Sequence, residues 1–223
     1  MKKAVENKVF VNGTIDGYTV VAIDGTKFFG SNKKSCPECL KNIKGEKTHC
    51  FHSGAVMSTV GAGPKLVIGF EMYRPGQDSS SKDEGELNVG KNLGIDAIVR
   101  AKNNNNKSLR QVKKKVNKLN PIVTTLMGMP LKILFKIIRA RWDIENSIFN
   151  NLKSECGLEH CFVHGGKAVG AVLYLIFIAS NIMQMFLIRR LKKHFTTQRE
   201  MVRLLVKGLY LLKYKSELIF NST

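Results

Sequence analysis

The chain has 223 residues, enough for one domain of ordinary size, and its 43% hydrophobic content excludes a disordered chain. The 36 basic and 17 acidic side chains give a net charge of +19, which favours a polyanionic partner such as DNA, RNA or an acidic membrane surface. An odd number of cysteines, 5, and no apolar stretch after Lys3 exclude a secreted disulfide scaffold. We therefore expect a reduced, cytoplasmic protein.

The first half of the chain reads as β-structure. Residues 18–24, YTVVAID, are almost continuously apolar and β-branched, which is typical of a strand covered on both faces. Four more strands are predicted, at 55–60, 65–72, 95–100 and 122–126. The glycine- and proline-rich turn at 61–64 separates the first two of these, and the polar stretch 74–92 reads as loop.

Residues 133–153 are predicted to form an amphipathic helix. At about 100° per residue, one half of the helical wheel is apolar. That half holds Ile133, Leu134, Ile137, Ile138, Trp142, Ile144, Ile148, Phe149 and Leu152. Arg141 and Glu145 project from the middle of it, where an unsatisfied charge would cost several kcal/mol. They are compensated either by a mutual ion pair, since positions i and i+4 are neighbours, or by a metal ion or phosphate held in a cleft.

The C-terminal third is predicted to be helical. Residues 170–188 are long and apolar enough to be considered as a membrane span, but Ser180, Asn181 and Gln184 argue for a buried core helix over 166–190 instead. A second helix is expected from Thr197, which has capping-box spacing to Glu200. Strands first and helices later indicate an α/β or α+β layer fold.

Asp24 is the first candidate for chemistry, since it follows the apolar strand and precedes Gly25. A carboxylate at the end of a buried strand lies where α/β sheets usually place ligands. Asp-Gly is also a strong hairpin signal. Both interpretations stay open on spacing alone.

Four segments together resemble the DDE transposases of bacterial insertion sequences, the cut-and-paste group with a ribonuclease H-like core. They are AIDGTKFF around Asp24, IVTTL at 122–126, RWDIENSIFNNLK from Arg141 to Lys153, and HCFVH at 160–164 with the apolar helix after it. The resemblance covers most of the chain. It implies DNA cleavage and strand transfer supported by Mg²⁺ or Mn²⁺, with Asp24 and Glu145 as catalytic metal ligands and Arg141 holding a DNA phosphate.

The chain also departs from the family pattern. Ile138 and Leu152 stand where the family has a tyrosine and a lysine, and Lys153 lies one place beyond the lysine position. The strand that carries the second acid has no room between Glu86 and Ile95, and Asp96, the nearest carboxylate, belongs to the following strand. We expect no N-terminal DNA-binding helices before Lys8.

The family's β-rich insertion is shortened to roughly 101–120, so we expect one incomplete ribonuclease H-like domain over residues 1–223, with a mixed sheet and flanking helices. Such a truncated remnant would lack the second catalytic acid. It would keep DNA affinity without cutting activity.

A cysteine and histidine constellation indicates a second function. Cys36 and Cys39 form half of a common zinc site, and later ligands would come from His49, Cys50 and His52, or from His160, Cys161 and His164. The alternatives are a turn with reduced thiols and a core position for the HCFVH segment. On this reading the chain is a non-enzymatic nucleic-acid-binding module stabilised by zinc, in which Arg141 and Glu145 are an internal ion pair.

Basic side chains are the expected phosphate contacts, although any one cluster could equally be a solvated charged face. The contacts predicted are Arg141, Lys153, Lys113, Lys114, Lys115, Arg189 and Arg190. The partners expected are the DNA of the element ends and the target, bound by a homodimer, with no membrane. The expected location is the bacterial cytoplasm, at the nucleoid.

Overall fold

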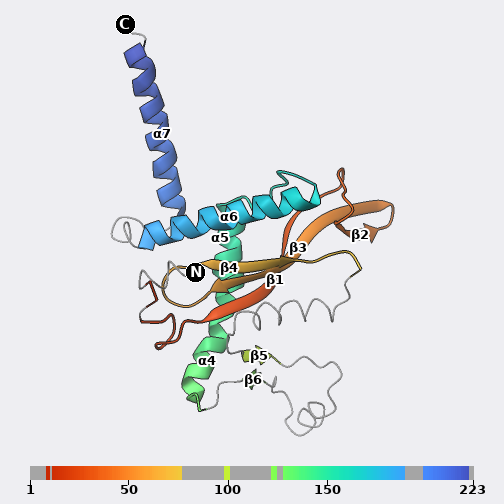
Figure 1. The fold of residues 1–223 in the computed structure, drawn as a ribbon, viewed down its shortest axis with the longest axis vertical. Helices are drawn as coiled ribbons and strands as arrows, with labels where there is room; N and C mark the ends of the chain where they lie inside the picture. Colours follow the sequence, from red (N-terminus) through yellow and green to blue (C-terminus); the bar gives the residue numbers. More distant parts are fainter. Residues whose placement is uncertain are drawn as a thin grey trace.

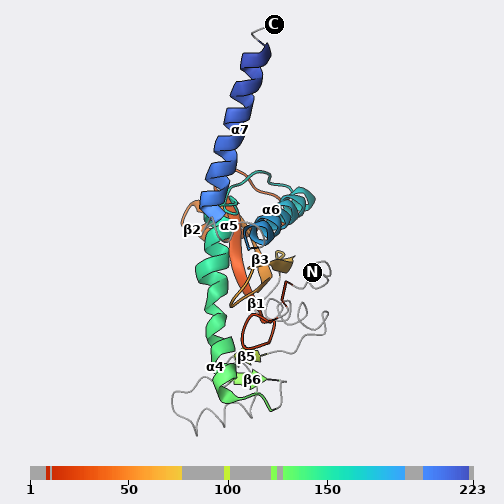
Figure 2. The same ribbon diagram turned by 90° about the vertical axis from the view of Figure 1, so that its left-hand side faces the viewer.

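The computed structural model describes residues 9–10, 12–76, 98–100, 122–124, 128–188 and 198–220. An antiparallel sheet lies between a long helical segment on one face and a second long helix on the other (Figures 1 and 2). The strands are β1 (Val21–Ser31), β2 (Leu40–Lys44), β3 (Lys47–Thr59), β4 (Val67–Met72), β5 (Ile98–Arg100) and β6 (Ile122–Thr124). The helices are α4 (Leu131–Ala140), η1 (Ile144–Phe149), α5 (Asn150–Ser154), α6 (Gly166–Phe186) and α7 (Gln198–Phe220).

The long strand β3 organises the sheet, because β1, β2 and β4 all pair with it. Every pairing among the described strands is antiparallel, including the separate pair of β5 with β6. The expected α/β class is confirmed, whereas the expected mixed sheet is not found in this part of the chain. The short links from β2 to β3 and from β3 to β4 explain the difference, because parallel neighbours need much longer crossovers.

The strand that contains Asp24 is longer than predicted. It does not end at Asp24 but runs to Ser31, with Asp24 opposite Val56 and Gly25 opposite Ala55 of β3. The Asp-Gly pair therefore makes no hairpin, and Asp24 lies inside a strand rather than at its end. Continuous pairing with β3 holds Gly25 extended, since the favoured hairpin turns need a positive φ that Gly25 does not have.

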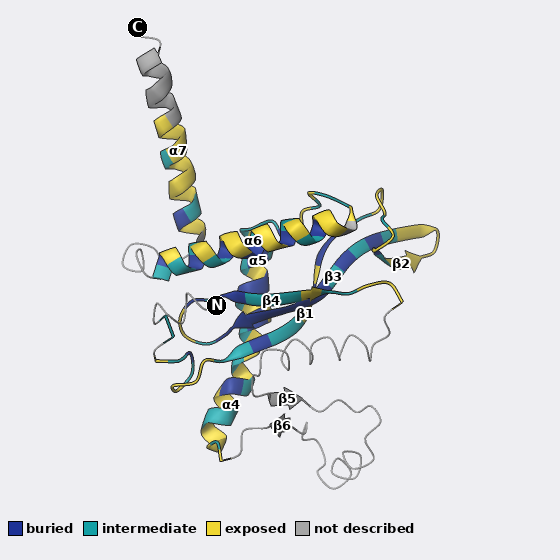
Figure 3. Ribbon diagram, in the orientation of Figure 1, coloured by how far each residue is buried: buried dark blue, intermediate teal, exposed yellow. Residues whose placement is uncertain are grey.

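The core forms where both helical layers meet the sheet. Phe28 of β1 lies edge-on to Phe70 of β4 and Phe177 of α6, with ring centroids 6.5 Å apart in each pair. On the other face, η1 and α5 contribute Ile144, Ile148 and Leu152, which are all buried (Figure 3). This burial of apolar side chains from both sides is the main stabilising term of the fold.

Helix α6 contributes only one of its faces to the core. Val169, Leu173 and Phe177 face inward and are buried, whereas the opposite face is exposed (Figure 3). The exposed large side chains are Tyr174, Leu175, Ile178, Ile182 and Phe186. Residues Lys167–Phe186 are long and apolar enough to cross a membrane by length and composition, a test that the core helices of other proteins also pass.

Asn181 explains why this apolar helix carries an amide. Its Nδ2 donates to the carbonyl oxygen of Val67 at 2.7 Å, and its Oδ1 accepts the N–H of Val67 at 2.8 Å. The side chain thus satisfies both backbone groups of the first residue of β4, as a neighbouring strand would. Asn181 therefore sets where α6 lies on the sheet.

Helix α7 stands away from the rest of the molecule (Figures 1 and 2). Its base is held by Arg199, which pairs with Glu155 at 2.7 Å, and by Met201, which is buried. Most of the side chains that follow are exposed, including Leu209 and Tyr210. The helix begins at Gln198, and its predicted capping residue, Thr197, lies outside the described residues.

We predict that Asn181→Ala lowers the free energy of unfolding by about 1–3 kcal/mol, because it leaves the N–H and the carbonyl of Val67 without a partner. Urea unfolding followed by circular dichroism measures this change. Ile182→Ala is the matched control, since that side chain is on the exposed face of the same helix. Equal losses for both variants would contradict the role of Asn181.

Candidate functional site

The predicted helix over 133–153 is present, but it is not a uniform α-helix. Helices α4, η1 and α5 follow one another from Leu131 to Ser154, and η1 is a π-helical turn. A π turn closes i→i+5 hydrogen bonds and so holds more residues than an α-helical turn; such turns are frequent at functional sites. This one begins immediately before Glu145.

Fewer side chains of the segment from Leu131 to Ser154 are buried than the helical wheel predicts. Ile144, Ile148 and Leu152 are buried as expected, but Trp142 is 60% exposed, and Arg141 and Glu145 are also exposed. The sheet covers the helix from one side only, and β1, on which η1 packs, has β3 as its one partner among the described strands. The expectation that both charges project into apolar surroundings is therefore wrong.

Asp143 anchors the helix to the turn between β3 and β4. Its Oδ2 accepts a hydrogen bond from the Lys65 ammonium at 2.7 Å and another from the Gly61 N–H at 3.0 Å. Burial opposes ionisation, but these two donors outweigh it and lower the pKa of Asp143. Gly61 has φ +93°, and a Cβ there would lie 2.7 Å from the carbonyl oxygen of Thr14, so the turn needs glycine.

This anchor places Arg141 and Glu145 beside Asp24. The carboxyl groups of Glu145 and Asp24 are within hydrogen-bonding reach, and Arg141 Nη1 lies 3.7 Å from Asp24 Oδ2. The Gly25 N–H donates to Asp24 Oδ1 at 2.9 Å, which fixes the carboxylate plane. Two acids from segments 121 positions apart (145 − 24) and one guanidinium thus meet at one surface point.

The Asp24 and Glu145 carboxyl groups are close enough to repel each other when both are ionised. The hydrogen bond with Asp24 and the repulsion by its charge raise the pKa of Glu145, and the positive charge of Arg141 offsets only part of this. The guanidinium pairs with Asp24 rather than with Glu145, so the predicted i,i+4 ion pair is not the contact that forms. Chemically, the pair needs either a shared proton or a cation.

Of the other predicted phosphate contacts, the structure describes Lys153 alone. Lys153 is ion-paired with Glu159 at 2.9 Å. Residues Lys113, Lys114, Lys115, Arg189 and Arg190, like Asp96, lie outside the part of the chain that the structure describes.

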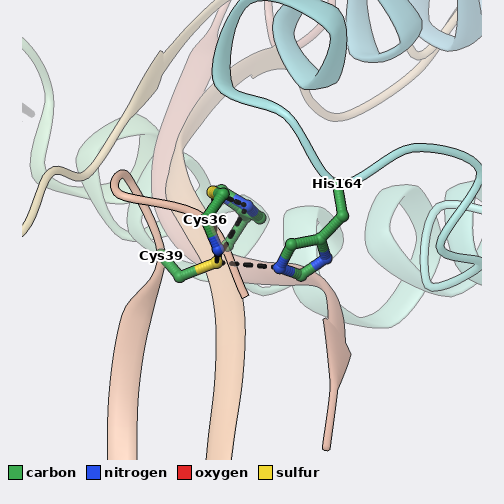
Figure 4. A group of neighbouring side chains, drawn as sticks. Cys36, Cys39 and His164 are labelled. Atoms are coloured by element: carbon green, nitrogen blue, oxygen red, sulfur yellow. Dashed lines mark hydrogen bonds between the residues drawn. The ribbon is translucent and has the colours of Figure 1, made fainter. Parts of the chain in front are cut away.

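A second cluster joins Cys36, Cys39, His52 and His164, whose ligand atoms all lie within 4.8 Å of one another. The two Sγ atoms are 3.2 Å apart, and each lies 3.5 Å from His52 Nε2. Cys39 Sγ is 2.8 Å from His164 Nε2, which reaches down from the loop between α5 and α6 (Figure 4).

Both buried members of this cluster, Cys39 and His52, are held in neutral forms. Burial, with the hydrogen bond from Cys36, raises the pKa of the Cys39 thiol to about 11. Burial and the neighbouring His164 lower the pKa of His52, whose side chain is fully buried. A neutral imidazole is the form that binds metals.

The structure chooses among the histidines that the sequence offered. His49 is excluded because its ring nitrogens lie 2.8 Å from Lys27 Nζ and 2.6 Å from Asn32 Oδ1. His160 stacks edge-on against Phe162 instead. The Cys-x-x-Cys spacing marked Cys36 and Cys39 in the sequence, but only tertiary folding could select His52 and His164.

Comparison with known proteins supports the resemblance seen in the sequence. Residues 86–182 match the family model described as transposase DDE domain. The match includes Glu145 and His164, and it confirms the predicted resemblance to DDE transposases over this part of the chain. No curated protein and no solved structure matches the chain.

We predict that Asp143→Ala lowers the free energy of unfolding by about 1 kcal/mol, because it removes two charge-assisted hydrogen bonds from a partly exposed site. Glu159→Ala is the control, since Glu159 makes an exposed ion pair with Lys153. Thermal and urea unfolding measure both. A loss for Asp143→Ala no larger than for Glu159→Ala would contradict the anchoring role.

Proposed function

We propose that this chain is a DNA-binding derivative of a DDE transposase, in which Asp24 and Glu145 bind a divalent cation. The observation that carries the proposal is the meeting of these two carboxylates, one from β1 and one from η1. The family match supports the Glu145 part of this proposal, because residues 86–182 include η1. Strand β1 lies outside the match, so Asp24 is assigned from its contact with Glu145.

The donor set suits the cation that the family implies. Mg²⁺ and Mn²⁺ bind carboxylate oxygens and fill their remaining positions with water. The raised pKa of Glu145 reports a repulsion that a cation between the two acids would relieve. When bound, such an ion activates a water or hydroxyl nucleophile and stabilises charge on a phosphate.

Arg141 is placed to hold a phosphate beside the acids. Its contact with Asp24 is long, at 3.7 Å, and its side chain is about half exposed. An exposed pair of this kind is weak, so the guanidinium can turn to a phosphate at little cost. Arg141 would then orient the DNA backbone by two parallel hydrogen bonds.

Several features support a remnant that lacks the second acid. Asp143 and Glu155, the neighbouring carboxylates on this helical segment, are engaged by Lys65 and Arg199. Strand β1 is 11 residues long and has one partner among the described strands. A long edge of that kind is normally covered. In the family, the second acid lies on another strand of the ribonuclease H-like core.

We therefore interpret residues 1–223 as a single incomplete ribonuclease H-like domain with a shortened insertion near 101–120. Its expected partners are the DNA of the element ends and of the target, bound by a homodimer in the bacterial cytoplasm at the nucleoid.

A second candidate function is a non-enzymatic nucleic-acid-binding module stabilised by zinc through Cys36 and Cys39. The observation that favours it is the cysteine and histidine cluster. On this reading Glu145 is a structural hydrogen-bond partner of Asp24, so its removal destabilises the fold. The two functions predict different effects of replacing Glu145 on cation binding and on stability.

Glu145→Gln is expected to weaken Mn²⁺ binding at least tenfold while leaving the free energy of unfolding unchanged or slightly raised. The neutral amide loses a cation ligand, but it also ends the repulsion with Asp24. Manganese binding measured by electron paramagnetic resonance and unfolding measured by urea titration check both effects.

Glu159→Gln is the matched control, because Glu159 is an exposed carboxylate paired with Lys153. It should leave Mn²⁺ binding unchanged. A clear destabilisation by Glu145→Gln, with Mn²⁺ binding intact, would favour the non-enzymatic module.

The chain is also expected to bind duplex DNA with an affinity that falls steeply with salt, as a net charge of +19 implies, and not to nick it in Mg²⁺. Fluorescence anisotropy on duplexes from the flanking DNA and a supercoiled-plasmid nicking assay test the two parts. Mg²⁺-dependent nicking that disappears in Glu145→Gln would show a complete catalytic site and contradict the remnant interpretation. Absence of DNA binding would contradict the proposed function altogether.

A further inference from the structure

We propose that Cys36, Cys39, His52 and His164 together bind one structural zinc ion that clamps the loop before α6 to the sheet. The inference does not depend on whether the chain binds or cuts DNA. It names the complete ligand set and gives the site a mechanical task.

The separations are close to those of a tetrahedral zinc site. With Zn–S near 2.3 Å and Zn–N near 2.0–2.1 Å, the edges of the tetrahedron are about 3.3–3.8 Å long. Both Sγ–Nε2 separations to His52 are 3.5 Å and lie in this range. The Sγ–Sγ separation, 3.2 Å, and that of Cys39 Sγ from His164 Nε2, 2.8 Å, are shorter, so zinc binding would move Cys36 and His164 slightly outward. Both cysteines are free thiols rather than a disulfide.

The burial of the site points to a structural rather than a catalytic ion. His52 is fully buried and Cys39 almost so, and the four protein ligands complete a tetrahedral shell. Catalytic zinc keeps one position for water or substrate, whereas structural zinc is closed. Two thiolates and two imidazoles in a tetrahedron also select zinc over hard cations such as Mg²⁺.

The buried position of the His52 ring indicates a partner at Nε2. Its Nδ1 has no hydrogen-bond partner among the residues that the structure describes, so the imidazole is held in place through Nε2 and by packing. Phe29 of β1 lies against both imidazoles, with ring centroids 5.5 Å from His52 and 6.4 Å from His164. Zinc bound at Nε2 would hold the ring in this orientation, in which two thiols already lie 3.5 Å away.

The ligands come from three places in the chain. Cys36 and Cys39 lie in the turn before β2, His52 is in β3, and His164 is in the loop between α5 and α6 (Figure 4). That loop is made of turns and bends, and it joins two helices that lie on opposite faces of the sheet (Figure 2). A metal bond to His164 closes a loop of more than 100 residues, where the entropic gain of a crosslink is large.

This site is separate from the acid pair. Asp24 and Phe29 lie five positions apart on β1, which at the usual rise of a strand is roughly 16 Å. The clamp therefore supports the same strand at its other end and takes no part in the chemistry at Asp24 and Glu145.

The first test uses the wild-type chain purified in the presence of a thiol reductant. Native mass spectrometry should show one zinc per chain, and chelation should lower the Tm by about 10 °C or more. Replacement by Co²⁺ should give the visible absorption of a tetrahedral site together with thiolate-to-cobalt charge transfer. A folded, metal-free protein whose Cys36 and Cys39 react at once with a thiol reagent would overturn the proposal.

The second test assigns the ligands. Cys39→Ser and His164→Asn should each lose the zinc equivalent, whereas His160→Asn and His49→Asn should retain it. If a ligand variant does not fold, the cobalt spectrum of the wild-type protein still tests the proposal. A spectrum without thiolate-to-cobalt charge transfer, or one typical of six-coordinate cobalt, would contradict the site. Zinc retained at full stoichiometry by both Cys39→Ser and His164→Asn would also overturn it.

Discussion

The candidate site depends on one constraint: the docking of the helical segment from Leu131 to Ser154 onto β1. Burial of Ile144 and Ile148 supplies the adhesion, and Asp143 supplies the position, because its carboxylate is held by the Gly61 N–H and the Lys65 ammonium. Apolar contacts are non-directional and would tolerate a slide of the helix, whereas two charge-assisted hydrogen bonds would not. Arg141 and Glu145 are placed beside Asp24 as a consequence.

The acid pair itself contributes nothing to stability. Two carboxyl groups in contact at an exposed site repel one another, and the nearby guanidinium compensates only in part. Such arrangements persist where the rest of the fold over-determines them, and they are common at functional sites. Here the fold does so from two sides, through the pairing of β1 with β3 and the anchor at Asp143.

Strand β1 connects the two polar centres of the molecule. Asp24 near its beginning belongs to the acid pair, and Phe29 near its end packs on the histidines of the cysteine and histidine cluster. Helix α6 is held to the rest of the fold near both of its ends. His164, just before its first turn, contacts Cys39, and Asn181, near its last turn, is hydrogen-bonded to Val67. The acid pair and the cysteine and histidine cluster thus lie near opposite ends of β1.

The local signals in the sequence determined a good part of this protein. Periodicity predicted the helices over 133–153 and 166–190, and residue types singled out Asp24, Glu145 and the Cys36–Cys39 pair. The apolar, β-branched runs predicted strands that overlap β1, β3, β4, β5 and β6, but not β2 or the first half of β3. These succeed because helix and strand periods, and the ligand chemistry of carboxylates and thiols, are properties of neighbouring residues. Even Asn181, an apparent flaw in an apolar helix, was visible as an exception, although its partner was not.

Only the tertiary structure decided what each residue meets. It extended β1 through Asp24-Gly25, because pairing with β3 overrides a local turn preference. It exposed Trp142, Arg141 and Glu145, because among the described strands β1 is paired on one side only and the sheet covers this helix along a narrow stripe. It paired Arg141 with Asp24 and chose His52 and His164 over His49 and His160. Contacts between residues more than 100 positions apart depend on packing, which no local pattern encodes.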